Sequence, residues 1–347
     1  MPVSVVVGGQ FGSEGKGKVT LEIVRRSAEP ATVVRVGGPN SGHTAYDTAG
    51  KMWALRQMPA GCVDRNVDVV FPAGSYLDVE ILFEEIDKLD FPRDRIFISP
   101  FANIITGQHK EWERNAGLIG AIGSTGSGVG AAIMAAVARG AANFPLQAVH
   151  AEHHDQLQPF LRDTSKVLFE KLLKNHRVVV EGSQGFGLSL LDGGYWPKAT
   201  ARSTTAAAAL AEAGLSPRYV DDVTMVLRSF PIRVAGDSGP LVGETSWQEI
   251  AKRAGRHDDL REYTTVTRKE RRVGEFDAEL VKRALAVNAP HRLVLNHLDY
   301  IAPMSSLEDP ESPVRRFIAD VETRIRRRVD WYGFSRLGVL ESKEFSA

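Results

Sequence analysis

The sequence predicts an α/β fold, a single elaborated domain spanning 1-347 around a mostly parallel central sheet. Short β-branched runs alternate with longer segments of helical periodicity, which is the pattern of a parallel sheet with connecting helices. The strand-like runs are continuously apolar, as in strands that are covered on both faces. No Pro/Ser-rich linker, internal repeat or low-complexity block divides the chain, so we expect one domain.

Seven segments have the composition of buried strands. In chain order they are Val3 to Val7, Thr32 to Val36, Asp68 to Phe71, Arg95 to Ser99, Val178 to Val180, Val223 to Leu227 and Leu293 to Leu295. The segments between them that have helical periodicity are Val19 to Arg26, Leu77 to Leu89, Gln156 to Lys174, Thr204 to Ala213 and Ala278 to Ala286. Alanine-rich stretches at 130–142 and 206–213 predict tightly packed helices.

Composition and charge exclude several classes of protein. The 43 basic residues balance the 43 acidic ones, so no net field draws the protein to nucleic acid or to an anionic membrane, and a bound anion needs a local site. No apolar run approaches membrane-spanning length. The chain opens directly on VSVVVGG without a secretory signal, and the single Cys62 cannot form an internal disulfide. We therefore expect a cytoplasmic protein.

A glycine-rich loop follows the first predicted strand. The segment GGQFGSEGKGK (8–18) precedes a helix, so its amide groups, the helix N-terminus and two lysines can hold phosphate. It is not a Walker A loop, because Gln10 stands where that motif needs glycine and Gly17 replaces its Ser/Thr. It also lacks the G-x-G-x-x-G spacing of dinucleotide sites. By itself the loop could equally be a flexible turn with solvated lysines.

A second glycine-rich turn, RVGGPNSGHT (35–44), follows the second predicted strand and carries His43 at its end. A lone histidine is usually structural. In a polar loop beside a phosphate site, however, it can act as a general acid or stabilise a transition state.

The two loops together resemble the signature turns G-D-E-G-K-G-K and G-G-x-N-x-G-H-T of the adenylosuccinate synthetase family. Further segments match in the same order. GSTGSGVGAA (123–132) resembles the family's T-G-R-G-I-G element, EGSQG (181–185) its E-G-A-Q-G, and YWPKATARSTTA (195–206) its Y-P-x-V-T-S-S-N-T-T. LRSFPIRVAGDSGPLVGE (227–244), TTVTRKERRVGEFD (264–277) and LNHLDY (295–300) continue the match to about residue 300, and the last forty-odd residues match poorly.

The resemblance implies an adenylosuccinate-synthetase-like fold related to the P-loop NTPases, and a ligase reaction. In this family a nucleoside triphosphate and Mg²⁺ drive phosphorylation of the 6-oxo group of a purine monophosphate, and the amine of L-aspartate then displaces the phosphate. Members of this family are homodimers, in which one arginine of each subunit reaches into the active site of the partner subunit.

By position, the resemblance assigns site residues. The catalytic set would be Ser13, His43, Lys16 and Gln184. The triphosphate would be held by Gly12, Glu14, Gly15, Lys16, Gly17, Asn296 and Asp299. The purine monophosphate would be held by Ser13, Asn40, Ser124, Thr125, Gln184, Thr200 and, from the other subunit, Arg139. L-Aspartate would be held by Thr267, Arg268 and Arg271, although TRKERR alone could be a solvated charge run. Mg²⁺ would contact Ser13 and the Gly42 carbonyl.

Ser13 stands where the family carries the aspartate that takes a proton from purine N1. A serine hydroxyl is no base near neutral pH without help, so the enzyme is inactive, or uses another base, or has a substrate that differs near N1. Because His43, Lys16, Gln184 and Arg271 remain, we favour the last. A shorter side chain leaves space for the 2-amino group of guanine. The same change resembles the phage 2-aminoadenylosuccinate synthetases, which act on dGMP for diaminopurine DNA and would work in the host cytoplasm.

Other departures concern the triphosphate and the ribose. In NHLD (296–299), His297 replaces the lysine of the family's GTP-reading T-K-L-D, so we expect ATP or dATP as the co-substrate. Ser127 replaces the arginine of T-G-R-G. Lys269 or Arg268 stands near the position of the family arginine that lies by the ribose 2′-hydroxyl. Loss of that arginine's contact with the hydroxyl would suit a deoxyribose. Two alternatives remain: an ordinary adenylosuccinate synthetase that uses IMP and GTP, and a non-catalytic nucleotide-binding module that reads guanine through NHLD.

Overall fold

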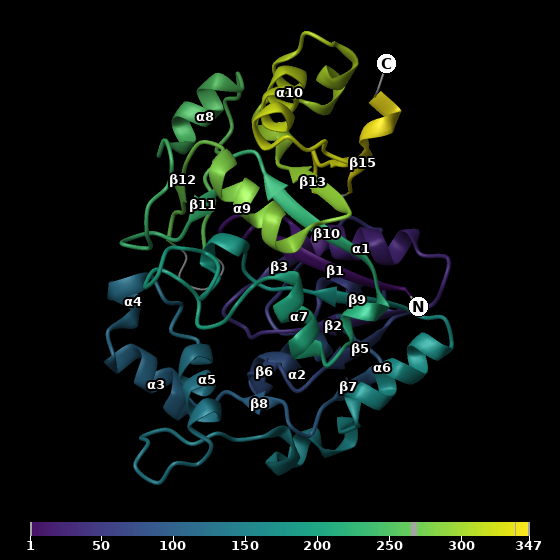
Figure 1. The fold of residues 1–347 in the computed structure, drawn as a ribbon, viewed down its shortest axis with the longest axis vertical. Helices are drawn as coiled ribbons and strands as arrows, with labels where there is room; N and C mark the ends of the chain where they lie inside the picture. Colours follow the sequence, from purple (N-terminus) through teal and green to yellow (C-terminus); the bar gives the residue numbers. More distant parts are fainter. Residues whose placement is uncertain (1, 265–268, 337, 346–347) are drawn as a thin grey trace.

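A nine-stranded sheet forms the centre of the protein (Figure 1). The computed structural model describes residues 2–264, 269–336 and 338–345. The strand order is β15-β14-β13-β10-β1-β9-β2-β5-β7, and every neighbouring pair is parallel except the edge pair β14 and β15. The strands are β1 Val3–Gly8, β2 Ala31–Arg35, β5 Asp68–Phe71, β7 Ile96–Ile98, β9 Arg177–Glu181, β10 Val220–Arg228, β13 Arg292–Asn296, β14 Trp331–Tyr332 and β15 Leu340–Glu341.

All seven predicted strands lie in this sheet, which confirms the predicted fold class. The two strands of this sheet that were not predicted, β14 and β15, have two residues each, too few to show a periodic pattern. Three two-stranded pairs lie outside the sheet: β3 His43–Tyr46 with β4 Met52–Leu55, β6 Tyr76–Leu77 with β8 Asn103–Ile104, and β11 Ile232–Arg233 with β12 Arg272–Val273.

Helices cover both faces of the sheet, as the continuously apolar strands require. Those that pack on it are α1 Lys16–Arg26, α2 Val79–Leu89, α6 Thr164–Leu173, α7 Ala206–Ala213, α9 Ala278–Asn288 and α10 Pro313–Ile325. The other helices are α3 Gly107–Asn115, α4 Leu118–Ile122, α5 Val129–Ala138 and α8 Trp247–Arg253. Side chains alternate across β1, so Val5 packs with α6, α7, α9 and α10 while Val6 packs with α1 and α2. These two cores make a three-layer structure.

Two predicted helices are wrong in extent. The segment 156–174 is not continuous, because a short 3-10 helix, Asp155–Phe160, is separated from α6. Pro159 lies inside the 3-10 helix, and Asp163 starts α6 by accepting a hydrogen bond from the Lys166 amide at 3.1 Å. The alanine-rich stretch 206–213 forms α7, whereas the helix predicted over 130–142 ends earlier, because α5 stops at Ala138 and Arg139 takes a left-handed conformation.

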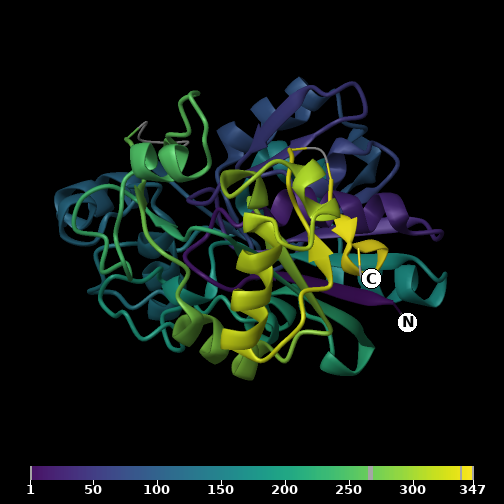
Figure 2. The same cartoon turned by 90° about the horizontal axis from the view of Figure 1, so that it is seen from above.

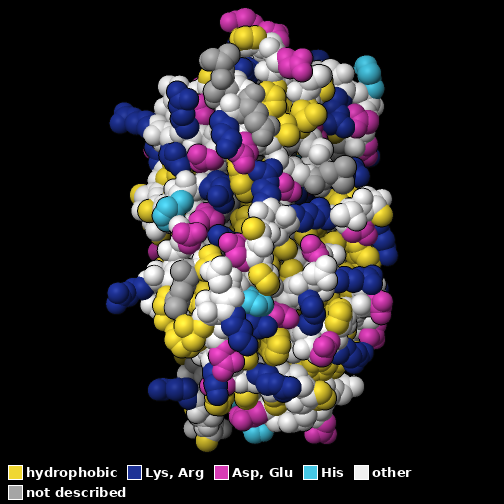
Figure 3. All heavy atoms as spheres, turned by 90° about the vertical axis from the view of Figure 1, so that its right-hand side faces the viewer, with side chains coloured by type: hydrophobic (Ala, Val, Ile, Leu, Met, Phe, Trp, Pro, Cys, Tyr) yellow, Lys and Arg dark blue, Asp and Glu magenta, His cyan; other side chains and the backbone are white. Residues whose placement is uncertain are grey.

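The carboxyl ends of the parallel strands meet at one edge of the sheet, which is where α/β sheets bind ligands. The turned view shows this central sheet with its covering helices (Figure 2). On the face shown in Figure 3, basic and acidic side chains are interspersed rather than gathered into one patch of a single sign. Within the described ranges, no helix is long and apolar enough to span a membrane.

Candidate functional site

A cavity of about 440 Å³ opens at the carboxyl edge of the sheet. Loops after β1, β2 and β9 form its wall, together with α4, α5, the loop that follows residue 195 and the segment around β11. The predicted site residues that line it are Gly12, Ser13, Gly15, Lys16, Gly17, Asn40, Gly42, His43, Ser124, Thr125, Gln184, Thr200 and Arg271. Folding therefore gathers residues from positions 12 to 271 around one space.

The other predicted residues are placed differently. Glu14 is fully buried behind the first loop, and Asn296 donates through Nδ2 to the Glu14 carbonyl at 2.7 Å. Asp299 and Arg139 do not line the cavity, and Arg139 is exposed just after α5. Thr267 and Arg268 lie outside the described residues.

The first glycine loop is bent by left-handed backbone and tied by Glu14. Gly12, Ser13 and Gly15 have φ values of 93°, 56° and 91°. Such values suit glycine, but a serine adopts them only where the surroundings hold it. The Glu14 carboxylate accepts hydrogen bonds from the Gly12 amide at 2.8 Å and from Lys16 Nζ at 2.8 Å. The loop is thus shaped around a buried carboxylate, with Lys16 at the start of α1.

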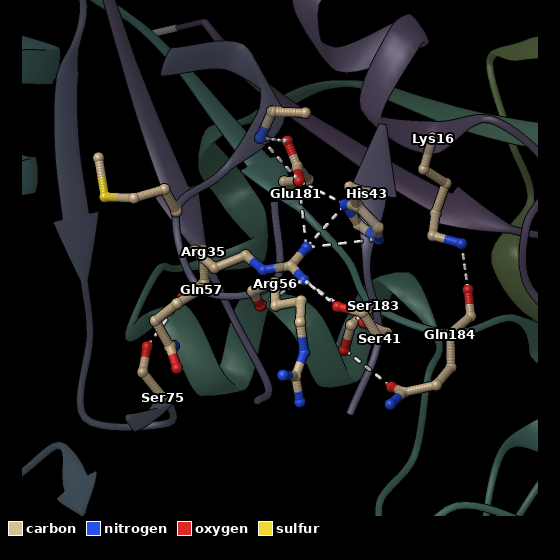
Figure 4. A network of polar contacts seen from close by, with 12 residues as sticks. Lys16, Arg35, Ser41, His43, Arg56, Gln57, Ser75, Glu181, Ser183 and Gln184 are labelled. Carbon is tan, nitrogen blue, oxygen red and sulfur yellow. Dashed lines mark hydrogen bonds and ion pairs between the residues drawn. The ribbon is translucent and has the colours of Figure 1, made fainter. Parts of the chain in front are cut away.

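His43 belongs to a buried cluster with Glu181 and Arg35 (Figure 4). Its Nδ1 atom is hydrogen-bonded to Glu181 Oε1, and Arg35 Nη1 lies 3.1 Å from the same oxygen. Glu181 also accepts the Ala60 amide at 2.9 Å. Arg35 Nη1 also lies 2.7 Å from His43 Nδ1 and 3.4 Å from His43 Nε2, so Glu181 and Arg35 together fix the orientation of the ring. When Nδ1 carries the hydrogen, it donates to Glu181, because a carboxylate can only accept.

The electrostatics of this cluster keep His43 neutral before ligands bind. Burial, and then the positive charge of Arg35, lower the pKa of His43 to about 4, against the opposing effect of Glu181. For Glu181, burial alone would raise the pKa, but His43 and Arg35 outweigh it and hold the pKa at about 2. A bound phosphate would bring negative charge close to the ring and raise the His43 pKa, which makes a proton donor available only when substrate is present.

A second cluster lies beside Ser13. Arg228 donates through Nη1 to the Ser13 carbonyl at 3.1 Å and is ion-paired with Glu262, which also accepts from Arg271 Nη1 at 3.0 Å. Arg228 lowers the pKa of the Glu262 carboxyl well below its usual range, although burial alone would raise it. His297 lines the same cavity as Ser13, and burial followed by the positive charge of Arg228 lowers its pKa to about 3. Ser13 and His297, the two notable departures, are therefore neighbours.

Arg35, Glu181, Arg228 and Glu262 were not predicted as site residues. Three of them do carry a signal in the sequence, because each is a charged residue at the end of an otherwise apolar strand. Arg35 ends β2, Glu181 ends β9 and Arg228 ends β10. Charged side chains at the carboxyl ends of parallel strands face the ligand edge of the sheet. Their mutual pairing is visible only in the folded chain.

The donor set around the loop has few charged groups for a metal ion. Among the residues that the structure describes, no three His, Cys, Asp or Glu side chains are grouped as metal ligands. The Glu14 carboxylate is engaged by Lys16, whereas Ser13 and Gly42 offer a neutral hydroxyl and a carbonyl at the cavity wall. Mg²⁺ commonly takes most of its ligands from phosphates and water. The residues present therefore fit a Mg²⁺ ion held mainly by substrate phosphates.

Nearly the whole chain is similar in sequence to known proteins. Residues 5–146 and 145–308 match the family model for adenylosuccinate synthetase. An adenylosuccinate synthetase from Thermococcus sibiricus is 37% identical over 334 residues, covering 94% of this chain and 93% of that protein. One from Methanococcus aeolicus is 35% identical, covering 94% of each.

Two solved structures share the fold. The cyanophage S-2L succinoaminodeoxyadenylate synthetase (PurZ), bound to dGMP and to dATP as an energy donor, has a TM-score of 0.80 and 26% identity, covering 98% of this chain and 95% of that one. Fully ligated adenylosuccinate synthetase from Plasmodium falciparum has a TM-score of 0.84 at 19% identity, covering 98% and 100%. Family model, relatives and fold agree, and the chain belongs to the adenylosuccinate synthetase family of ligases.

Proposed function

We propose that this ligase joins L-aspartate to the 6-position of dGMP, with hydrolysis of ATP or dATP, to give N6-succino-2-amino-2′-deoxyadenylate for diaminopurine DNA synthesis. The observation that carries the proposal is Ser13, which lines the cavity beside His43, Lys16 and Gln184. The rest of the loop keeps the family turn G-D-E-G-K-G-K, and Ser13, the group that would meet purine N1 and C2, is its one change.

Physical chemistry at position 13 favours a 2-amino purine. An aspartate carboxylate at position 13 would stand next to the edge of the purine base. The hydroxymethyl group of Ser13 is shorter and uncharged. The freed space accommodates the guanine amine, and the serine oxygen can accept a hydrogen bond from it. Hypoxanthine has no such amine and would leave this oxygen without that partner.

The similarity to known proteins supports both the proposal and its alternative. The cyanophage PurZ structure carries dGMP and dATP and covers 98% of this chain. The similar archaeal proteins are named adenylosuccinate synthetases, and they are closer in sequence. The second candidate is therefore the ordinary reaction of IMP and L-aspartate with GTP.

The choice of triphosphate rests on His297. This residue packs against Tyr300 with 5.3 Å between ring centroids, and burial followed by the charge of Arg228 lowers its pKa to about 3, which favours the neutral ring. A family lysine in its place would cover a guanine ring, whereas His297 is held by the protein itself. We infer that guanine is not selected here and that an adenine nucleotide is used.

The remaining roles follow the positions in the cavity. We infer that Lys16 and the loop amides hold phosphates, and that His43 donates to the transferring phosphoryl group or the 6-oxo group. Asn40, Ser124, Thr125, Gln184 and Thr200 hold the monophosphate, and Arg271 a carboxylate of L-aspartate. The Ser13 hydroxyl and the Gly42 carbonyl would hold Mg²⁺, which would supply positive charge to offset that of the substrate phosphates.

A substrate matrix tests the proposed function. Purified protein is incubated with L-aspartate and Mg²⁺, with dGMP, GMP, IMP or dIMP, and with ATP, dATP or GTP in each combination. We expect aspartate-dependent phosphate release with dGMP and an adenine triphosphate, and formation of the succino-adduct by mass spectrometry. Turnover of IMP but not of dGMP would overturn the proposal in favour of the ordinary reaction.

Arg139 predicts composite active sites in a homodimer. It lies at the end of α5 and does not line the cavity of its own chain, which fits an arginine that serves a partner. Neither Arg139→Ala nor His43→Ala alone should be active, but mixed dimers contain one site with both residues intact. We expect mixing to restore up to about a quarter of the wild-type activity by site statistics. Heterodimers verified by two affinity tags that recover no activity would contradict sharing.

A further inference from the structure

Arg202 is a buried cation behind the purine-monophosphate wall of the cavity. It lies in the loop before α7 and is 8% exposed. Its guanidinium makes a two-pronged contact with Glu212 of α7, through Nε to Oε1 at 2.8 Å and through Nη2 to Oε2. This pair neutralises the arginine but leaves Nη1 directed at the loop after β9.

A one-way relay of hydrogen bonds runs from this nitrogen to the cavity. Arg202 Nη1 donates to Ser183 Oγ and, at 3.3 Å, to Gln184 Oε1. Ser183 Oγ donates to the same Gln184 oxygen at 2.8 Å, and Gln184 Nε2 donates to Asn40 Oδ1 at 2.8 Å. Figure 4 shows Ser183 turned toward the Gln184 side chain. Gln184 and Asn40 both line the cavity.

The direction of the relay is fixed by chemistry. Arginine has only donors, so the oxygen of the Gln184 amide must face it and the NH₂ group must face Asn40. The Asn40 oxygen is then occupied, which leaves the Asn40 NH₂ group for the cavity. Rotating the Gln184 amide by half a turn would place NH₂ against the guanidinium and oxygen against oxygen. Both amides therefore present donors, which suit phosphate oxygens and the 6-oxo and N7 acceptors of a purine.

The relay also joins three loops. Gly37, in the loop that carries Asn40, has φ 82°, and a Cβ atom there would lie 2.4 Å from Ser183 Oγ and 2.6 Å from Arg202 Nη1. The backbone thus packs directly on the relay. Counted from Thr200, the family element T-S-S-N-T-T has serine where this chain has Arg202.

We propose that Arg202 is a positioning residue that locks the amide orientation of Gln184, and through it of Asn40, so that the cavity offers hydrogen-bond donors to the purine monophosphate. This rests on the proposed purine-monophosphate site, but it holds for dGMP and for IMP alike.

The test compares Glu212→Gln with the double variant Arg202→Met/Glu212→Gln. The single variant keeps the Nη1 donor, and the double variant removes it without leaving an unpaired buried carboxylate. We expect the double variant to raise the Kd and KM for the monophosphate about 10-fold over the single variant, as for loss of a charge-assisted hydrogen bond. The KM for L-aspartate and for the triphosphate should change less than about 2-fold, and Arg202→Lys should recover part of the loss because lysine also donates.

The outcomes separate this inference from the proposed function. Kd is measured by calorimetry with dGMP and IMP, and the melting temperature is followed for every variant. Wild-type preference for IMP would remove the dGMP proposal while leaving the comparison of variants intact. Equal monophosphate affinity in the single and double variants would overturn the role of Arg202. A uniform rise of all three KM values that tracks a lower melting temperature would show a structural role only, and would overturn it too.

Discussion

His43→Ala is expected to lower kcat by about 10²- to 10⁴-fold, the range for loss of a positioned proton donor, while KM changes little. His43 is 6% exposed, and its Nδ1 atom is fixed by Glu181, so its ring orientation is set before substrate arrives. Interactions made mainly in the transition state affect turnover rather than substrate affinity. Steady-state kinetics with each of the three substrates measures both quantities.

Two further variants sharpen this prediction. Glu181→Gln keeps the shape of the cluster but removes the negative charge that opposes Arg35, so the pKa of His43 should fall. The protonated donor form of His43 should then be harder to reach, and we expect a loss of kcat that is smaller than for His43→Ala. His153→Ala removes an exposed histidine and serves as the matched control. If the kcat of His43→Ala lies within about 3-fold of the wild-type value, the loss is far smaller than the usual contribution of acid catalysis. That result would exclude His43 from the chemistry.

Ser13→Asp is expected to change the choice of purine. The carboxylate should crowd the guanine 2-amino position and restore an N1 base, so the ratio of kcat/KM for dGMP to that for IMP should fall by about 100-fold or more, the scale on which buried polar groups discriminate substrates. Loss of folding is not the expected cause, because aspartate tolerates left-handed backbone better than most residues, and Ser13 has φ 56°. Competition assays with both monophosphates and melting temperatures measure the two effects.

Ser13→Asn separates the size of the side chain from its charge. Asparagine fills nearly the volume of aspartate but cannot serve as a base, so it should lose dGMP turnover without gaining IMP turnover. Gain of IMP activity in Ser13→Asn would show that the side-chain volume alone sets the preference. Retention of dGMP preference in Ser13→Asp would show that position 13 does not determine the substrate, and would overturn the role given to Ser13.

Most of the architecture was predictable because local signals and tertiary packing agree. The runs at Val3 to Val7 and Val178 to Val180 are apolar on both sides, and they form strands covered by helices on both faces. The error over 156–174 has a local origin, since helical periodicity continued across Pro159 and the Asp163 cap. The terminal strands β14 and β15 depend on pairing with a sheet that is already formed.

The sequence by itself determined the fold class, the two glycine loops and the family, because glycine spacing and buried apolar runs leave few backbone solutions. Only the tertiary structure decided how charges are paired. Arg35, His43 and Glu181 come from three separate segments and become one buried cluster, and the Arg202 relay fixes the amides of Gln184 and Asn40. Ser13 and His297 are far apart in the chain, yet they meet at one wall of the cavity. The physical reason is the parallel sheet, which brings the carboxyl ends of distant strands to a single edge. The low dielectric at this buried edge strengthens each hydrogen bond and ion pair and makes an unpaired charge costly.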